Sequence, residues 1–544
     1  MYRAIKSVTI FGVFFAIAIA LYWPACHAGM VHDFISWALA YKLQGIQGMR
    51  HQFGDQGLHP LYHLVFFCLY KAIGLNSIAW FFVFLFLHVF NATLSFSFFQ
   101  LLLSRSSIRH ASLISFFGAL FFLISPYQTE PVVWKATIHY LTTTALVLMA
   151  LMFALKYMQD GEVKNLILLH LCYLLALFSL EIAFSIPLLL FVLSQFWDRR
   201  IFGGVSAFQF TLRVVVPQLL VIPEYFLLSK IILGNWIGHY GAAAHLNFSP
   251  VILSSHLNGY LAKYLLFFQF AGFQKRQLLY NCLVNPVFAN TAFGFCVIVM
   301  AVLLMVPYRL KPLHRAGFLL FIMFLAGTIT TLNLFFTYIV NVEGDRLTYL
   351  ASVFILMLVS YVVWQLPKMF SVLILVCFLF FSIKFLHYNI ESWRCNQQIS
   401  DSLIDDFKCD PGVNVCLLNI PDNYRGTYMF RSHLDETVFA DALYLKRGID
   451  MRTQIQQVLL YNMNALSDSV LVESAGANAL KITFAQWGNW WWWYGKGAQN
   501  YSTKDYNVVI DGMAHSYVIT FRNTLPDTKY LYQCGGEWRE VKGF

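Results

Sequence analysis

The sequence predicts a polytopic α-helical membrane protein of about eleven spans, followed by a small α/β domain outside the membrane. Of its 544 residues, 59% are hydrophobic and 12% are charged, whereas a soluble chain carries about twice that charged fraction. Apolar runs of roughly 17 to 25 residues recur through the first two thirds, and each is long enough to cross a bilayer. The runs show no two-residue alternation, so they are expected to be helices rather than barrel strands.

The N-terminus is expected in the cytoplasm because Arg3 and Lys6 precede the first apolar run, and basic residues favour that side. The opening also resembles a secretory signal with a small-residue cleavage site. We favour an uncleaved first helix at about 8–24, since Trp23 and Pro24 stand directly before the supposed cut.

A long outer loop, about 25–77, is expected to hold two amphipathic helices at the membrane interface, near 31–48 and 60–74. Basic residues cluster at the ends of the later spans that this topology makes cytoplasmic. Those spans are expected at 78–103, 111–126, 139–157, 165–180, 182–198, 208–233, 289–308, 315–333, 347–365 and 369–387. The apolar stretch at 251–273 is expected in an outer loop as a re-entrant or surface helix.

The composition changes after residue 388, which divides the chain into a membrane domain, 1–388, and an outer soluble domain, 389–544. Charged and turn residues return there, and short β-like runs appear: "VNVCLLNI", "SVLVES", "NVVIDG" and "HSYVITFRN". The tail is one small domain in size. It contains Cys395, Cys409, Cys416 and Cys534. On an oxidising outer side these could form up to two disulfides, with three possible pairings, or they could be free buried thiols.

Charged residues indicate a site at the outer interface rather than a path through the bilayer. The net charge of +10 comes from residues spread among short loops, which argues against nucleic acid as a partner. Transporters keep charged residues inside their spans. In this chain nearly all charged residues lie at the ends of the expected spans, and Arg213, Glu224 and Lys230 are the exceptions. The outer loops instead gather Asp33, Asp55, His59, His63, Glu130, Lys135, His139, Glu181, Glu343, Asp345 and Arg346.

The stretch "SPYQTEPVVWKATIHY", residues 125–140, predicts a helix break around an acid. Pro126 and Pro131 stand on either side of Glu130, and proline interrupts the helical hydrogen-bond ladder. An acid near lipid is costly unless it faces water or a partner. Glu130 is therefore either a functional carboxylate or the solvated acid of a turn.

The order of motifs resembles the GT-C class of membrane glycosyltransferases. It is closest to relatives of the transmembrane-and-TPR O-mannosyltransferases, although no TPR repeats follow. The motifs are "CHAGMVHDFISW" (26–37), "HPLYHLVFFCLYKAIGLNSIAWFFVFLFLHVFNATL" (59–94), "SPYQTEPVVW" (125–134), "SLEIAFSIPLLL" (179–190) and "DRLTYLASV" (345–353). The chain departs from the family pattern at His32, where many relatives have an acid, at Ser125, where they have His, and at Asp345, where they have Glu.

The resemblance implies transfer of a sugar from a polyprenyl phosphate to an acceptor hydroxyl at the outer face, with inversion. Asp33 is the expected general base, and Glu130 is the second expected catalytic residue, which binds sugar hydroxyls, orients the acceptor or ligates a divalent ion. Arg346, Lys135 and Lys263 are expected to bind the donor phosphate, with Lys275 and Arg276 behind them. No cofactor is implied with certainty, and a divalent metal, Mg or Mn, is an open possibility.

Further residues are candidates for contacts with the substrate. His59 and His63 share a helix face and could bind a metal, and interfacial packing with hydrogen bonding is the alternative that we favour. Arg346 could instead neutralise a neighbouring acid. The aromatic run "WGNWWWWYGKG" (487–497) could stack on sugar rings or anchor the domain on the membrane. The substrate-binding set is His59, His139, Glu343, Asp345 and Trp487.

Two other functions stay open from the sequence. A ligase or polymerase of lipid-linked polysaccharide would use the same face, and a lipid or polysaccharide flippase or transporter would need a polar cavity across the bilayer. The acceptor is expected to be a surface glycan, a glycolipid or a protein. The expected location is the bacterial inner membrane with the C-terminal domain outside the cytoplasm, and the endoplasmic reticulum membrane is the alternative.

Overall fold

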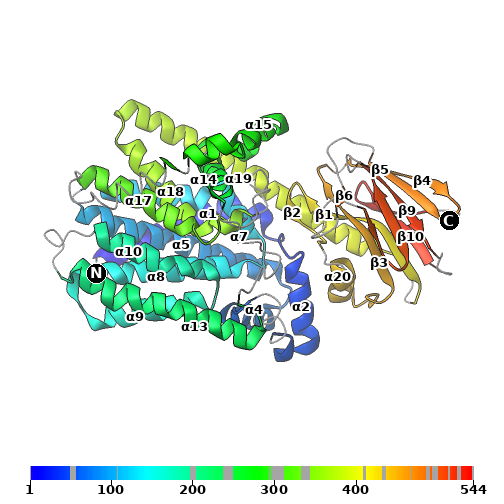
Figure 1. Ribbon diagram of the computed structural model, residues 1–544, viewed down its shortest axis with the longest axis horizontal. Coiled ribbons are helices and arrows are strands. Elements are labelled where there is room, and N and C mark those ends of the chain that lie inside the picture. The colour runs from blue at the N-terminus through cyan, green and yellow to red at the C-terminus, as the bar shows by residue number, and fades with distance from the viewer. Residues whose placement is uncertain are drawn as a thin grey trace. The chain divides into compact units, whose positions relative to one another are not determined.

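The chain divides into two compact units in a computed structural model (Figure 1). The structure describes residues 2–49, 57–106, 108–196, 204–236, 249–292, 294–295, 312–332, 344–408, 412–431, 437–465, 467–484, 491–492, 500–511, 515–522 and 528–541. The first unit comprises residues 1–23, 49–133 and 137–389, and the second comprises 24–48, 134–136 and 390–544.

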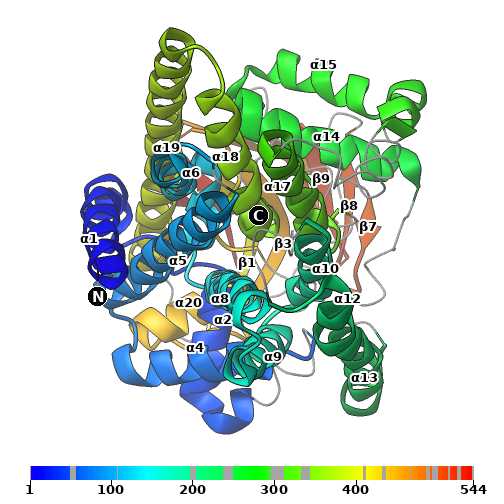
Figure 2. The same cartoon turned by 90° about the vertical axis from the view of Figure 1, so that its left-hand side faces the viewer.

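The first unit is helical. Its longer helices are α1 (Tyr2–Tyr22), α4 (Pro60–Ile73), α5 (Ser77–Arg105), α6 (Ala111–Ile124), α8 (Ile138–Asp160), α9 (Val163–Leu177), α10 (Ile186–Phe196), α13 (Val216–Leu233), α14 (Pro250–Leu266), α15 (Phe273–Leu283), α17 (Pro312–Thr328), α18 (Tyr349–Trp364) and α19 (Lys368–Asp405). The last of these, α19, continues into the second unit. Helix α5 packs against both α6 and α8, and α18 packs against α6 and α17, as Figure 2 shows.

Six helical segments in the described part of the chain are long and apolar enough to cross a membrane, or seven if the bent pair at 111–133 is one span. They are Ser7–Ala25, Ser77–Ser104, Ile138–Asp160, Ala207–Leu233, Asp345–Trp364 and Lys368–Asp405. Shorter apolar helices occupy the spans expected at 165–180, 182–198 and 315–333. Much of the span expected at 289–308 lies outside the described residues, so the count of eleven stays a prediction.

The apolar side chains of the outer helices fit a lipid environment. On α13, Leu220 and Ile231 are 62% and 71% exposed, as expected where hydrocarbon rather than protein covers a helix. Inside the bundle, a Cβ at Gly118 of α6 would lie 2.5 Å from the Met357 side chain of α18. Glycine therefore permits the close approach of these two helices.

The second unit contains two sheets. The first sheet has the order β11-β10-β1-β3-β6, with β2 paired to β1, and the second has the order β4-β5-β9-β8-β7. The strands are β1 (Asn414–Tyr424), β2 (Thr427–Tyr428), β3 (Ile455–Met463), β4 (Val470–Gly476), β5 (Ala479–Phe484), β6 (Trp491–Trp492), β7 (Tyr501–Ser502), β8 (Tyr506–Ile510), β9 (Ser516–Phe521), β10 (Thr528–Cys534) and β11 (Glu537–Glu540). The central strand β1 runs parallel to both β3 and β10. Helix α20 (Val438–Arg447) connects β1 to β3, as parallel neighbours require.

Two early segments of the chain pack within this second unit, which the sequence did not indicate. Helix α2 (Asp33–Gln44) lies against α20. The backbone N–H of Lys135 donates to the carbonyl of Gly29 at 2.9 Å. Met30 N–H donates to the side-chain oxygen of Gln397 at 3.1 Å. The first outer loop is therefore partly built into the same unit as the C-terminal strands.

The local expectations for secondary structure are largely confirmed. Helices α2 and α4 occupy the two amphipathic stretches of the first loop, and α14 occupies the ambiguous stretch at 251–273. The four β-like runs correspond to β1, β4, β8 and β9. Cys395, Cys416 and Cys534 carry free thiols, and Cys409 lies outside the described residues.

Candidate active site

The structure places the predicted site residues in two groups. Glu130, Arg346, Lys263, Asp345, His59 and His139 lie in the first unit, and Asp33 and Lys135 lie in the second. Lys275 and Arg276 lie on α15. Glu343 and Trp487 lie outside the described residues.

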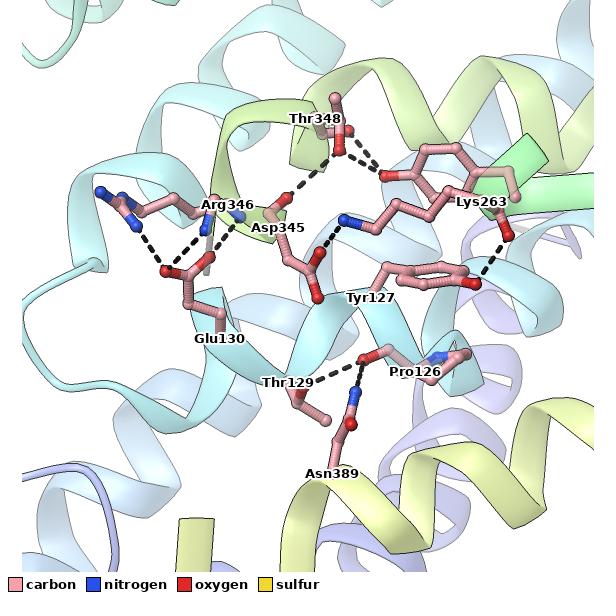
Figure 3. A network of polar contacts seen from close by, with 11 residues as sticks. Pro126, Tyr127, Thr129, Glu130, Lys263, Asp345, Arg346, Thr348 and Asn389 are labelled. Carbon is pink, nitrogen blue, oxygen red and sulfur yellow. Dashed lines mark hydrogen bonds and ion pairs between the residues drawn. The ribbon is translucent and has the colours of Figure 1, made fainter. Parts of the chain in front are cut away.

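The first group is built on the expected helix break. Helix α6 ends at Ile124, and the chain continues through η2 (Pro126–Gln128) into α7 (Thr129–Val133), bent by 56°. The carbonyl of Pro126 accepts the backbone N–H of Thr129, and it also accepts bonds from Thr129 Oγ1 and Asn389 Nδ2, both at 2.9 Å (Figure 3). Two side chains thus add hydrogen bonds to the backbone at the break.

Glu130 is held by the chain segment that begins the late loop motif. Its carboxylate is 1% exposed and forms an ion pair with the Arg346 guanidinium. It also accepts from the backbone N–H of Arg346 at 2.7 Å and of Gly344 at 3.4 Å (Figure 3). These N–H groups lie at the N-terminus of η9 (Asp345–Thr348), where a negative charge is favoured. Gly344 has φ +87°, a conformation that glycine adopts without strain.

A second buried ion pair lies beside the first. Lys263 of α14 pairs with Asp345, and the two are 2% and 0% exposed (Figure 3). The Lys263 ammonium also lies 5.0 Å from the centre of the Tyr127 ring. The other carboxylate oxygen of Asp345, Oδ2, is buried without a hydrogen-bond partner among the described residues. We define these four residues, Glu130, Arg346, Lys263 and Asp345, as the charge cluster.

A His–Glu pair lies in the same unit. His59 Nε2 is 2.5 Å from Glu181 Oε2, and the Glu181 side chain is 26% exposed. Tyr140, next to the predicted His139, is 3% exposed and is near enough to Arg346, Glu130 and Glu181 to interact with them electrostatically. The His139 ring packs 4.3 Å from the Tyr62 ring.

Asp33 begins α2, and its side chain is 31% exposed. Its Oδ1 lies 3.3 Å from Nε2 of His32. The His32 ring in turn stacks on Trp134, with centroids 5.7 Å apart and planes 8° apart. Asp33 is thus a partly exposed carboxylate next to an imidazole, which suits a proton acceptor.

Lys135 is fully buried in the second unit. Burial lowers its pKa from 10.5 to about 7, and the nearby Cys26 acts in the opposite direction. Below about pH 7 the folded protein therefore holds a charged ammonium group in a buried site, which lowers its stability. The ammonium carries no such cost in the unfolded chain, where the usual pKa applies.

We expect this lysine to make stability depend on pH. Between about pH 7 and 10 the unfolded chain binds a proton that the folded protein lacks, so the free energy of unfolding rises with pH, by at most about 1.4 kcal/mol per unit. Thermal unfolding at pH 7 and pH 9 should show this gain in the wild type and not in Lys135→Met. Lys481→Met, at an exposed lysine on β5, is the control and should keep it. Equal pH dependence in all three proteins would contradict the assignment.

The residues present do not favour a metal site. No three His, Cys, Asp or Glu side chains in the described ranges are grouped as metal ligands. The acids of the charge cluster already pair with cations. The described side chains therefore offer no ligand set for the divalent metal that the sequence leaves open.

Several contacts at the site were not predicted. The partnership of Glu181 with His59 joins two motifs that the sequence separates by more than 100 residues, and nothing in the spacing signals it. The sequence also did not predict the pairing of Lys263 with Asp345, although each residue was a candidate for binding the donor or the substrate. The turn at Gly344 could have been predicted, since a glycine directly before "DRLT" suggests a backbone conformation with positive φ.

The apolar helices and the β-rich C-terminal part define a multi-pass helical membrane protein with two compact units. No protein-family model and no curated protein matches the chain. Among solved structures it is similar to the crystal structure of ArnT from Cupriavidus metallidurans bound to undecaprenyl phosphate. That similarity has a TM-score of 0.30 and 11% sequence identity, and it covers 83% of this chain and 92% of that chain. A similarity this low carries no statement about function.

Proposed function

We propose that this protein is a GT-C-type membrane glycosyltransferase. It moves a sugar from a polyprenyl phosphate to an acceptor hydroxyl at the outer face of the membrane, with inversion. The observation that supports this most is the charge cluster, four ionisable side chains buried together beside a helix break. Burying charges in a protein of this kind is costly, and they are usually kept for function.

The cations of the charge cluster suit a phosphate. In the transfer, the bond from the anomeric carbon to the phosphate oxygen breaks, and the leaving polyprenyl phosphate gains negative charge. Arg346 and Lys263 would stabilise that charge, as cationic donors in a water-poor site do. A guanidinium carries five N–H donors, so Arg346 can contact Glu130 and a phosphate together.

The acids have separate proposed roles. Asp33 accepts the proton of the acceptor hydroxyl as its oxygen bonds to the anomeric carbon. Glu130 fixes Arg346 and orients the substrate. Asp345, whose Oδ2 is buried without a described partner, accepts a hydrogen bond from a sugar hydroxyl. One base and no separate nucleophile give a single displacement, so the product has the opposite anomeric configuration.

The test uses the purified full-length chain in lipid vesicles. Polyprenyl phosphates carrying radiolabelled hexoses or pentoses are supplied with a membrane extract as acceptor, with EDTA in a parallel sample to decide the metal requirement. We expect labelled product, release of polyprenyl phosphate and an inverted anomer by NMR. Retention of configuration would contradict the single displacement. Transfer only from oligosaccharides on a lipid diphosphate would favour a ligase or polymerase instead.

A further inference from the structure

The residue before Asp33 has an unusual backbone. His32 has φ +51° and ψ −123°, in a region that residues other than glycine rarely occupy. Such a conformation costs on the order of 1–3 kcal/mol and persists only where the surroundings enforce it. Strain of this kind concentrates at functional sites. The contacts that enforce it at His32 therefore also fix the position of the neighbouring Asp33.

Two aromatic rings, those of Trp134 and Tyr428, pack against the His32 ring within the second unit. The His32 ring stacks on Trp134 and lies 5.2 Å from the Tyr428 ring, and Trp134 and Tyr428 are 4.6 Å apart. All three residues are at most 9% exposed. The guanidinium of Arg431 lies 4.5 Å from the centre of the Tyr428 ring and is itself fixed by two bonds to Asp422, at 2.8 and 2.7 Å.

The backbone ahead of Asp33 is tied at four successive residues. Gly29 accepts from Lys135 N–H at 2.9 Å, and Met30 donates to Gln397 at 3.1 Å. Val31 accepts from Trp134 Nε1 at 3.2 Å, and His32 donates to the Met429 carbonyl at 3.2 Å. The partners come from residues 134–135 and from the C-terminal part of the chain.

We propose that Trp134 and Tyr428 are positioning residues that fix Asp33 through His32. The three rings, His32, Trp134 and Tyr428, form the Asp33 clamp. This inference rests on the proposed role of Asp33 as the base and deepens it, because it ties the base to the C-terminal part of the chain within the second unit. A base displaced by about 1 Å loses roughly 100-fold in rate, so loosening the clamp lowers turnover rather than donor binding.

The first experiment measures the position of residue 33 without sugar transfer. In the full-length chain carrying Asp33→Cys, the rate of labelling by N-ethylmaleimide is followed by mass spectrometry of the peptide that contains residue 33. Adding Tyr428→Ala removes two ring contacts, and we expect labelling to become about 10-fold faster. If the alanine variant does not fold, Tyr428→Leu replaces it in this measurement, because leucine fills part of the space without providing a ring.

Two controls accompany this measurement. Tyr428→Phe keeps the ring and should leave the labelling rate within about two-fold. Tyr444→Ala removes a tyrosine that contacts Lys42 near the other end of α2, and it should also leave the rate unchanged. Equal labelling rates in Tyr428→Ala, Tyr428→Leu and Tyr444→Ala would overturn the clamp.

The second experiment measures transfer with Asp33 intact. Tyr428→Ala should lower kcat by about 100-fold and leave the donor KM nearly unchanged, while Tyr428→Phe retains transfer. A raised donor KM at unchanged kcat would overturn the positioning role. Full transfer by Asp33→Asn would instead refute the proposed base, and the labelling rates would still decide whether the clamp fixes residue 33.

Discussion

We expect Glu130→Gln to lower the rate of sugar transfer by about 100- to 1,000-fold. Glutamine keeps the shape of the side chain and can still accept from the backbone N–H groups of Gly344 and Arg346. It removes the charge, however, and leaves the buried Arg346 guanidinium without its ion-pair partner. Breaking a buried pair in this way is destabilising, by up to about 3–5 kcal/mol. Initial rates at saturating donor, together with the melting temperature, measure both effects.

A surface glutamate provides the control for this variant. Glu162 pairs with Lys164 at 2.6 Å, and the two side chains are 47% and 72% exposed. Exposed pairs contribute about 0–1 kcal/mol, so Glu162→Gln should change neither rate nor stability. If Glu130→Gln transfers sugar as fast as the wild type, Glu130 has no role in transfer.

The second large effect is expected from Asp33→Asn. The amide cannot take the proton of an acceptor hydroxyl, and loss of a general base typically lowers a rate by about 100- to 10,000-fold. Because the Asp33 side chain is partly exposed, the melting temperature should fall little. The two variants therefore differ in character: Glu130→Gln lowers both rate and stability, and Asp33→Asn lowers mainly the rate.

The control for Asp33 lies in the same unit. Asp441 is in the first turn of α20, as Asp33 is in that of α2, so Asp441→Asn removes a similar interaction with a helix N-terminus. It should leave transfer intact. A wild-type rate for Asp33→Asn would refute its assignment as the base.

Local structure was predictable wherever the hydrophobic period or a breaker residue determines it. Pro126 and Pro131 predicted the helix break around Glu130. The apolar run that begins near residue 78 predicted α5. The two prolines also indicated where a polar side chain could lie inside the bundle, since an interrupted helix leaves backbone groups that need partners.

Contacts between distant segments were not predictable. The sequence gives Lys263 as a basic residue near an apolar stretch, and only the tertiary structure brings it to Asp345, 82 positions later. In the same way, nothing local marks Trp134 as a partner of Tyr428. Pairing of this kind depends on helix packing and strand order, which one sequence does not encode in any short pattern.

The bond between Met30 and Gln397 has a consequence for how the protein is made. The two residues are 367 positions apart, and ribosomes add about 5–20 residues per second. The segment that carries Asp33 is therefore synthesised roughly 20–70 s before the chain that ties it down exists. During that interval the strained conformation of His32 has no support from Met429 or Tyr428, so the backbone before Asp33 cannot be held in its final conformation until residues 397–429 have been synthesised.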